Sequence, residues 1–133
     1  MQDNTITLAV DTANSGSTTS TAYCRYAEEL NRSTYITSSH VPNSTVDSMT
    51  FGRTLPTKNG TFFGTGKSQV KFTKTVSVAA SDGTTLKVPL IIDIGFSVPV
   101  GTSSAEVVKL RQTALALLDN DTIMNLLNIT LSV

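Results

Sequence analysis

The fold is decided by the stretch LKVPLIIDIGFSVPV at residues 86–100. In its second half, large apolar side chains alternate with small or polar ones: Ile92, Ile94, Phe96 and Val98 take one set of positions, and Asp93, Gly95 and Ser97 take the other. A period of two predicts a β-strand that is buried on one face. Because Pro99 has no N–H to donate, strand pairing should end there.

Two helices are predicted after this strand. Ser103 and Glu106 have the spacing of a capping box, and a helical apolar pattern follows over residues 104–118. The sequence Asp119-Asn120-Asp121 interrupts that pattern and can cap a second, short helix, which carries Ile123, Met124, Leu126 and Leu127. We therefore expect two α-helices within residues 103–130.

The residues before position 86 indicate antiparallel hairpins. Alternating segments near residues 5–10, 18–26, 31–38, 44–55 and 67–79 are separated by clusters of Gly, Pro, Asn and Ser that favour turns. The predicted fold class is α+β, with an antiparallel sheet of six or seven strands. We expect a single domain over residues 1–133, made of an N-terminal β-hairpin (1–30), a main sheet (31–100) and the two helices (103–130).

The helix predicted at residues 104–118 has an unusually broad apolar surface. Its apolar side chains cover roughly half of the cylinder, whereas a surface helix typically shows a stripe of ~100°. The helix could lie on one large sheet, but a position between its own sheet and a second subunit explains the width better. Arg111 lies inside the apolar arc, so it should extend its charge to water or reach a carboxylate. We therefore predict a homodimer whose interface includes Val107, Leu110, Arg111, Ala114, Leu115 and Leu118.

Composition excludes several classes of protein. The 133 residues carry no net charge, and only 15% are charged. A single cysteine, Cys24, cannot form an intramolecular disulfide. No apolar run approaches the ~20 residues of a membrane span, and no signal-peptide pattern opens the sequence. We expect a protein that is made in the cytoplasm and has no membrane partner.

Catalytic and metal-binding chemistry has little support in the sequence. His40, the only histidine, lies in a loop rich in Ser, Pro and Asn, without a recognisable nucleophile beside it. No Cys/His cluster has zinc-site spacing, and no Gly-rich loop opens a helix. We predict no catalytic residue, no metal site and no cofactor, which leaves a small β-rich hydrolase as the least supported interpretation.

Basic residues gather in one region of this neutral chain. Six of its ten Lys and Arg residues lie between positions 53 and 87, where Asp82 is the only acid. Along the strand predicted at 67–79, a polar face opposes an apolar one, and Ser48 and Thr50 on the preceding strand should extend it. The polar face carries Lys67, Gln69, Lys71 and Thr73. Lysines and hydroxyls in this arrangement suit contact with nucleic-acid phosphates, although an ordinary solvated sheet face is the alternative.

Four segments are similar to one known family: QVKFT (69–73), LKVP (86–89), FSVPV (96–100) and the helix at 106–118. Through them, the sequence from Lys67 onward resembles the coat proteins of levivirus-type single-stranded RNA bacteriophages. The order of predicted elements agrees over nearly the whole chain, while the recognisable motifs lie in its C-terminal half.

The resemblance implies a dimer in which each subunit's helices lie across the partner's sheet, and dimers that close an icosahedral shell in the virion. It also implies that one face of the sheet binds genomic RNA, including a hairpin that represses translation. A maturation protein would be a further partner, and the bacterial cytoplasm the place of synthesis. On this basis the predicted RNA-binding residues are Lys67, Gln69, Lys71, Thr73, Ser48, Thr50 and Asp93.

Two features depart from the family pattern. On the last strand, Ile91 and Asp93 stand where the family commonly has neutral RNA-contacting side chains. A carboxylate repels phosphate but can accept a hydrogen bond from a cytosine amino group. The connection at 79–87 is short, whereas in the family this loop takes alternative shapes at different symmetry axes. A Thr-rich β adhesin or pilus-type subunit is the runner-up interpretation, which the many hydroxyls suit and the two terminal helices do not.

Overall fold

The computed structural model describes residues 4–13 and 15–128. The chain separates into two compact units, which we describe one at a time. The sheet unit comprises Met1–Leu55 and Gly66–Ser97, and the helical unit comprises Pro56–Thr65 and Val98–Val133. The prediction of a single domain over the whole chain stays a prediction.

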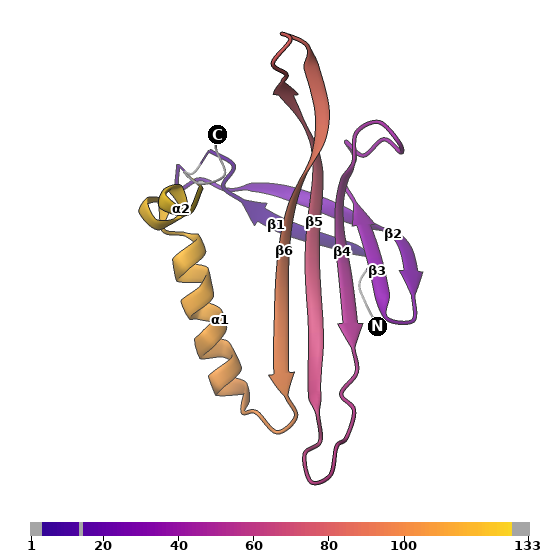
Figure 1. Cartoon of the computed structure of the whole chain (residues 1–133), viewed down its shortest axis with the longest axis vertical. Coiled ribbons are helices and arrows are strands. Elements are labelled where there is room, and N and C mark those ends of the chain that lie inside the picture. The colour runs from indigo at the N-terminus through magenta and orange to yellow at the C-terminus, as the bar shows by residue number, and fades with distance from the viewer. Residues whose placement is uncertain (1–3, 14, 129–133) are drawn as a thin grey trace. The chain divides into compact units, whose positions relative to one another are not determined.

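Six strands form one sheet, in which each strand is hydrogen-bonded to the next along the chain (Figure 1). The pairings from the first strand to the fifth are antiparallel. The predicted fold class is therefore confirmed, with six strands among the described residues. They are β1 (Thr5–Val10), β2 (Thr19–Glu29), β3 (Arg32–Ile36), β4 (Asp47–Thr54), β5 (Thr65–Ala79) and β6 (Thr85–Pro99).

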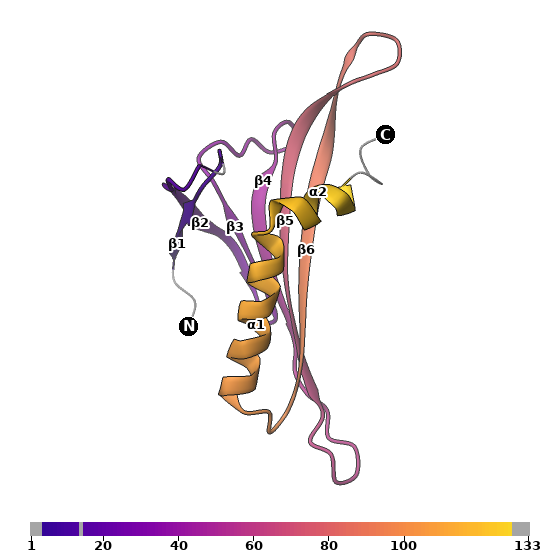
Figure 2. The ribbon, with the colours of Figure 1, turned by 90° about the vertical axis from the view of Figure 1, so that its left-hand side faces the viewer.

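Strand β2 pairs with two neighbouring strands, and its register is irregular in the part that pairs with β3. Its residues Thr19–Cys24 pair with β1, and its residues from Cys24 onward pair with β3. The register shifts between Arg25 and Ala27, an irregularity of the kind that bends a strand. Figures 1 and 2 show the β1–β2 hairpin turned across one face of the remaining strands. Because its last residues pair with β3, β2 continues to Glu29, three residues beyond the predicted end at 26.

The core of the sheet unit lies on β3 and β4. Along β3, Ser33 and Tyr35 are buried while their neighbours are more exposed, as the period of two requires. Tyr35 packs edge-on against Phe51 of β4, with ring centroids 5.7 Å apart. Edge-to-face aromatic contacts of this kind add to the stabilisation from area burial.

Strand β6 occupies one edge of the sheet and ends at Pro99, as predicted. Its alternation is present, but its apolar face is open in the single chain: Ile92 is 56% exposed. The prediction of a buried face is thus wrong for one chain, because more than half of the Ile92 surface has no described residue packed over it. The turn into β6 is tight, since Asp82 accepts hydrogen bonds from the N–H and hydroxyl of Thr84.

The helical unit contains α1 (Ser104–Leu118) and α2 (Asp121–Asn128). Ser103 caps α1 by accepting a 3.4 Å hydrogen bond from the N–H of Glu106, as predicted. Asn120 caps α2 through the N–H of Ile123, so the second helix also begins where expected; the predicted residues 129 and 130 lie outside the described part. No helix within the described ranges is long and apolar enough to cross a membrane.

Candidate nucleic-acid interface

The β4–β5 register brings the predicted polar face together. Lys71 lies directly opposite Thr50, and Thr73 lies opposite Ser48. Since alternate residues of a strand point to the same face, Lys67 and Gln69 project beside them. The six residues predicted on these two strands therefore share one face of the sheet.

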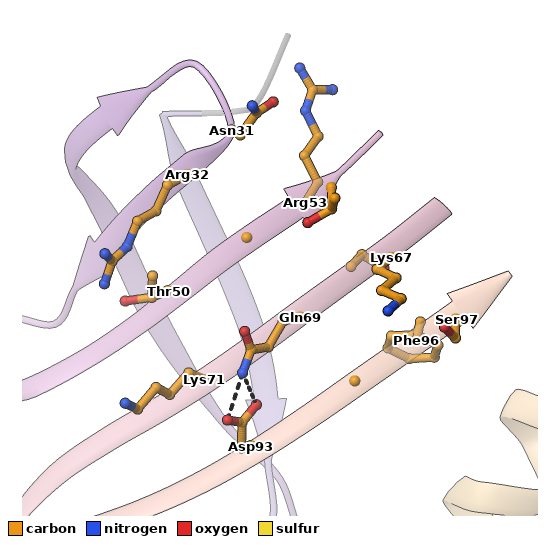
Figure 3. Close-up of a pocket in the computed structure, with 14 residues that line it drawn as sticks. Asn31, Arg32, Thr50, Arg53, Lys67, Gln69, Lys71, Asp93, Phe96 and Ser97 are labelled. Carbon is orange, nitrogen blue, oxygen red and sulfur yellow. Dashed lines mark hydrogen bonds between the residues drawn. The ribbon is translucent and has the colours of Figure 1, made fainter. Parts of the chain in front are cut away.

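Asp93 joins this face from β6. The side-chain amide nitrogen of Gln69 donates to both carboxylate oxygens of Asp93, at 2.7 and 2.6 Å (Figure 3). The structure thus gathers all seven predicted residues on one surface. That they contact RNA stays a prediction.

A hollow of about 810 Å³ opens on this surface. Five of the predicted residues line it: Lys67, Gln69, Lys71, Thr50 and Asp93. Ser48 and Thr73 lie on the same face but outside the hollow. The remaining lining residues, which sequence reasoning did not include, are Asn31, Arg32, Gly52, Arg53, Thr54, Ser68, Gly95, Phe96 and Ser97.

Arg32 is the most informative of the residues that were missed. It opens β3 and pairs with Gly52 of β4, which places its side chain on the polar face beside Thr50 (Figure 3). Arg53 stands at the rim, where its guanidinium donates a 3.4 Å hydrogen bond to the carbonyl of Leu30. Sequence periodicity could not place Arg32 or Arg53 at the hollow, because their position there depends on which strands pair and in what register.

The hollow carries four cationic side chains and one carboxylate. Asp93 is bound by an uncharged amide and forms no ion pair with these cations, so four positive charges outnumber one negative charge. Neither Arg32, Arg53, Lys67 nor Lys71 forms an ion pair with another described residue. A surface with several uncompensated cations and interleaved hydroxyls can attract phosphates and position a nucleic-acid backbone.

The predicted dimer-interface residues lie along α1, none of whose side chains is buried in the single chain. Leu110 is 73% exposed, and Leu115 and Leu118 are also exposed. Arg111 and Ala114 are exposed, while Val107 is half-buried. Arg111 forms no ion pair with any described residue of the single chain. Whether it extends its charge to water or reaches a carboxylate in the dimer stays a prediction.

Metal-binding and thiol chemistry find no centre in the part of the chain that the structure describes. Its His, Cys, Asp and Glu residues form no group of three or more that could hold a metal ion. Cys24 is an exposed free thiol. His40 accepts a hydrogen bond at Nδ1 from the backbone N–H of Asp47, so it holds a loop in place.

Comparison with solved structures identifies the fold. The structure titled virus-like particle of bacteriophage AVE019 matches with a TM-score of 0.76 and 16% sequence identity, covering 96% of this chain and 95% of that one. The virus-like particle of Beihai levi-like virus 21 matches with a TM-score of 0.71 and 11% identity, over 98% and 96%. The bacteriophage EMS014 coat protein matches with a TM-score of 0.61 and 14% identity, over 88% and 74%.

No family model matches the sequence, and no curated protein matches it. The chain therefore has the fold of the coat proteins of levi-like phages, as the sequence predicted, with little residue-level identity to those structures.

Proposed function

We propose that this chain is the coat protein of a levi-like single-stranded RNA phage, and that its dimers assemble into an icosahedral shell around genomic RNA. The observation that carries the proposal is the fold likeness, which extends over nearly the full length of both chains in two of the three comparisons. The role is structural rather than enzymatic, and its place is the virion.

Exposed apolar surface supports a dimer. Ile92 on β6 and Leu110 on α1 are more than half exposed in a single chain, and β6 has an unpaired edge. Contiguous apolar patches and free strand edges are costly in water and commonly mark interfaces. A second copy of the chain that packs on β6 and on the apolar arc of α1 would cover the exposed apolar surface and pair the free strand edge.

The polar face supports RNA as the enclosed partner. Its cations have no carboxylate partners among the described residues, and its hydroxyls can bond to phosphate or sugar. We extend the proposal to an RNA hairpin bound as a translational repressor, and to one maturation protein in the virion, because the resemblance implies both. Synthesis in the cytoplasm of a bacterial host belongs to the same proposal.

Expression in a bacterium tests the function directly. Purified protein should form uniform shells by negative-stain microscopy, and the ratio of absorbance at 260 and 280 nm should show nucleic acid inside. Treatment with ribonuclease after disassembly, followed by gel filtration, should separate that absorbance from the protein, because the RNA is cut into small fragments. Fibres would favour the adhesin or pilus-type alternative, and a stable monomer with no larger species would contradict the coat function.

A further inference from the structure

The loop of residues 56–65 displays two neighbouring aromatic side chains, Phe62 and Phe63. Both are exposed, and 60% of the Phe63 surface is open to water. Lys58 is the only charged residue of the loop, and its Nζ lies over the Phe63 ring, 5.4 Å from the centroid. Single exposed apolar residues are common on proteins, whereas apolar side chains that cluster on a surface mark an interaction site.

Backbone hydrogen bonds hold this loop in one shape. Asn59 and Phe62 exchange two of them, at 2.9 and 3.1 Å, which close a tight hairpin. The carbonyl of Gly64 accepts a third, of 2.9 Å, from the N–H of Val100. Because the loop is already ordered, it loses little conformational freedom when its aromatic side chains bind a partner.

A second hollow, of about 360 Å³, lies beside the β2–β3 turn, and we call it the apolar pocket. Phe51 and Val70 lie opposite each other in the β4–β5 register, and they alternate with the residues of the polar face. Their side chains therefore point to the other face of the sheet. The apolar side chains that line the pocket are Leu30, Phe51, Val70 and Phe96.

The charged side chains that line the apolar pocket balance one another. Glu28 and Glu29 lie there together with Arg32 and Arg53, which gives two negative and two positive charges. A lining with apolar side chains and no net charge favours an uncharged, apolar occupant. An aromatic ring suits it in particular, because guanidinium groups stack on aromatic faces.

A dimer interface by itself cannot build a shell. In a two-fold dimer both copies use the same surface, so the interface joins two chains and is then complete. The shell of the proposed function needs a further interface, which joins one dimer to the next. Outside β6 and the two helices, Phe62 and Phe63 are the only exposed large apolar residues of the described ranges that are adjacent in sequence.

We propose that Phe62 and Phe63 of one dimer insert into the apolar pocket of a neighbouring dimer. In the single chain both phenylalanines are exposed and the pocket is open, so another copy of the chain can supply the partner of each. The contact is heterologous, since loop and pocket are different surfaces of the same chain, and repeating it can close rings of dimers. The inference rests on the proposed function, because it names the surfaces that join dimers into the shell.

The double variant Phe62→Ser, Phe63→Ser tests the loop. It should remain a folded dimer in analytical ultracentrifugation, while the lowest concentration at which shells form, measured by light scattering, should rise at least about tenfold, because aromatic anchors in pockets carry much of the energy of an interface. Val41→Ser is the control, since Val41 is an exposed apolar loop residue outside both surfaces, and it should assemble as wild type. Normal assembly of the double variant would overturn the inference, and so would loss of its dimer, which would place the loop inside the dimer interface.

Leu30→Ser tests the pocket. Leu30 is exposed in the single chain, so the variant should fold and dimerise as wild type, and its shells should also require a higher concentration. Normal assembly of Leu30→Ser beside failed assembly of the loop variant would show that the loop binds elsewhere, which would overturn the pairing. A wild-type protein that forms no shells would instead overturn the proposed function, so the two failures are distinguishable.

Cross-linking locates the contact without removing either surface. In a Cys24→Ser background, which has no other cysteine, chains with Thr61→Cys are assembled together with chains that carry Asn31→Cys and treated with a short bismaleimide. Thr61 precedes Phe62 in the loop, Asn31 lines the pocket, and both are exposed. Cross-links between the two kinds of chain should form in mixed shells and not in free dimers. Their absence from mixed shells, or their presence in free dimers, would overturn the inference.

Discussion

Tyr35 and Met49 lie directly opposite each other in the register of β3 and β4, and both are fully buried, with 0% and 2% of their surfaces exposed. They are the largest fully buried side chains of the described chain. The pair therefore forms the central core contact between β3 and β4.

Met49→Ala should therefore destabilise the protein by about 2–5 kcal/mol, the cost of a cavity left by a large core side chain. Urea unfolding at a fixed protein concentration measures the change. Leu30→Ala is the control: Leu30 is 87% exposed, so its truncation should shift the free energy of unfolding by less than about 0.5 kcal/mol. Equal effects of the two substitutions would place the core elsewhere.

Leu115→Ala should weaken folding and association together. If a second copy buries Leu115, its truncation should lower the free energy of unfolding by about 2–5 kcal/mol. Because the two subunits would share this core, the stability of each subunit cannot be separated from dimerisation. Analytical ultracentrifugation combined with circular dichroism measures both. Gln112→Ala, on the opposite arc of α1, should leave them unchanged. A folded wild-type monomer at low micromolar concentration would contradict the dimer.

Lys71→Ala should reduce RNA affinity for all sequences alike. Removing one phosphate contact should flatten the slope of log K against log salt by up to about 1 unit, by analogy with duplex DNA. Filter binding at several salt concentrations gives the slope, and shells should still form. Lys109→Ala on α1 should keep the wild-type slope. Identical slopes for Lys71→Ala and wild type would remove Lys71 from the RNA-binding face.

Gly64→Ala should destabilise the loop of residues 56–65. Gly64 has a φ of +94°, and an added Cβ would collide with the backbone of Thr57. The carbonyl of Gly64 also accepts a 2.9 Å hydrogen bond from the N–H of Val100. The loss should exceed the roughly 1–2 kcal/mol of left-handed strain expected for Gly60→Ala, whose φ is +63° in open space. Thermal unfolding of both variants measures the difference, and an equal loss would show that the loop can move aside.

The β5–β6 turn should loosen in acid. Hydrogen bonds from the hydroxyl and the N–H of Thr84 lower the pKa of Asp82 below its usual value. A lowered folded pKa means that the stabilisation is complete above the unfolded pKa and is lost as the pH falls through the folded pKa. The protection factor of the Thr84 amide, which compares its exchange rate with that of an unstructured peptide at the same pH, should therefore fall below about pH 4. Asp82→Asn should abolish this fall, and a wild-type protection factor that does not change with pH would show that the carboxylate does not hold the turn.

Sequence signals close to the end of a helix or strand predicted where that helix or strand begins or ends. Helix α1 has the predicted bounds, because the Ser103 cap and the Asp119-Asn120-Asp121 sequence act within one turn of its ends. Strand β6 ends at Pro99 because proline lacks the N–H that a ladder needs. The end of β2 was predicted too early, because its last residues are ordered by pairing with β3 across a change in register.

The sequence by itself determined which residues of each strand share a face, since the period of two is a property of the extended backbone. Lys67, Gln69 and Lys71 could be grouped in this way, as could Ser48 and Thr50. Only the tertiary structure decided that Arg32 stands on the polar face, that Gly52 lies opposite Gln69, and that Gln69 reaches Asp93. Cross-strand register brings together residues far apart in the chain, and one residue of slip would turn a strand's side chains to the other face. The hollow exists only once that register is set.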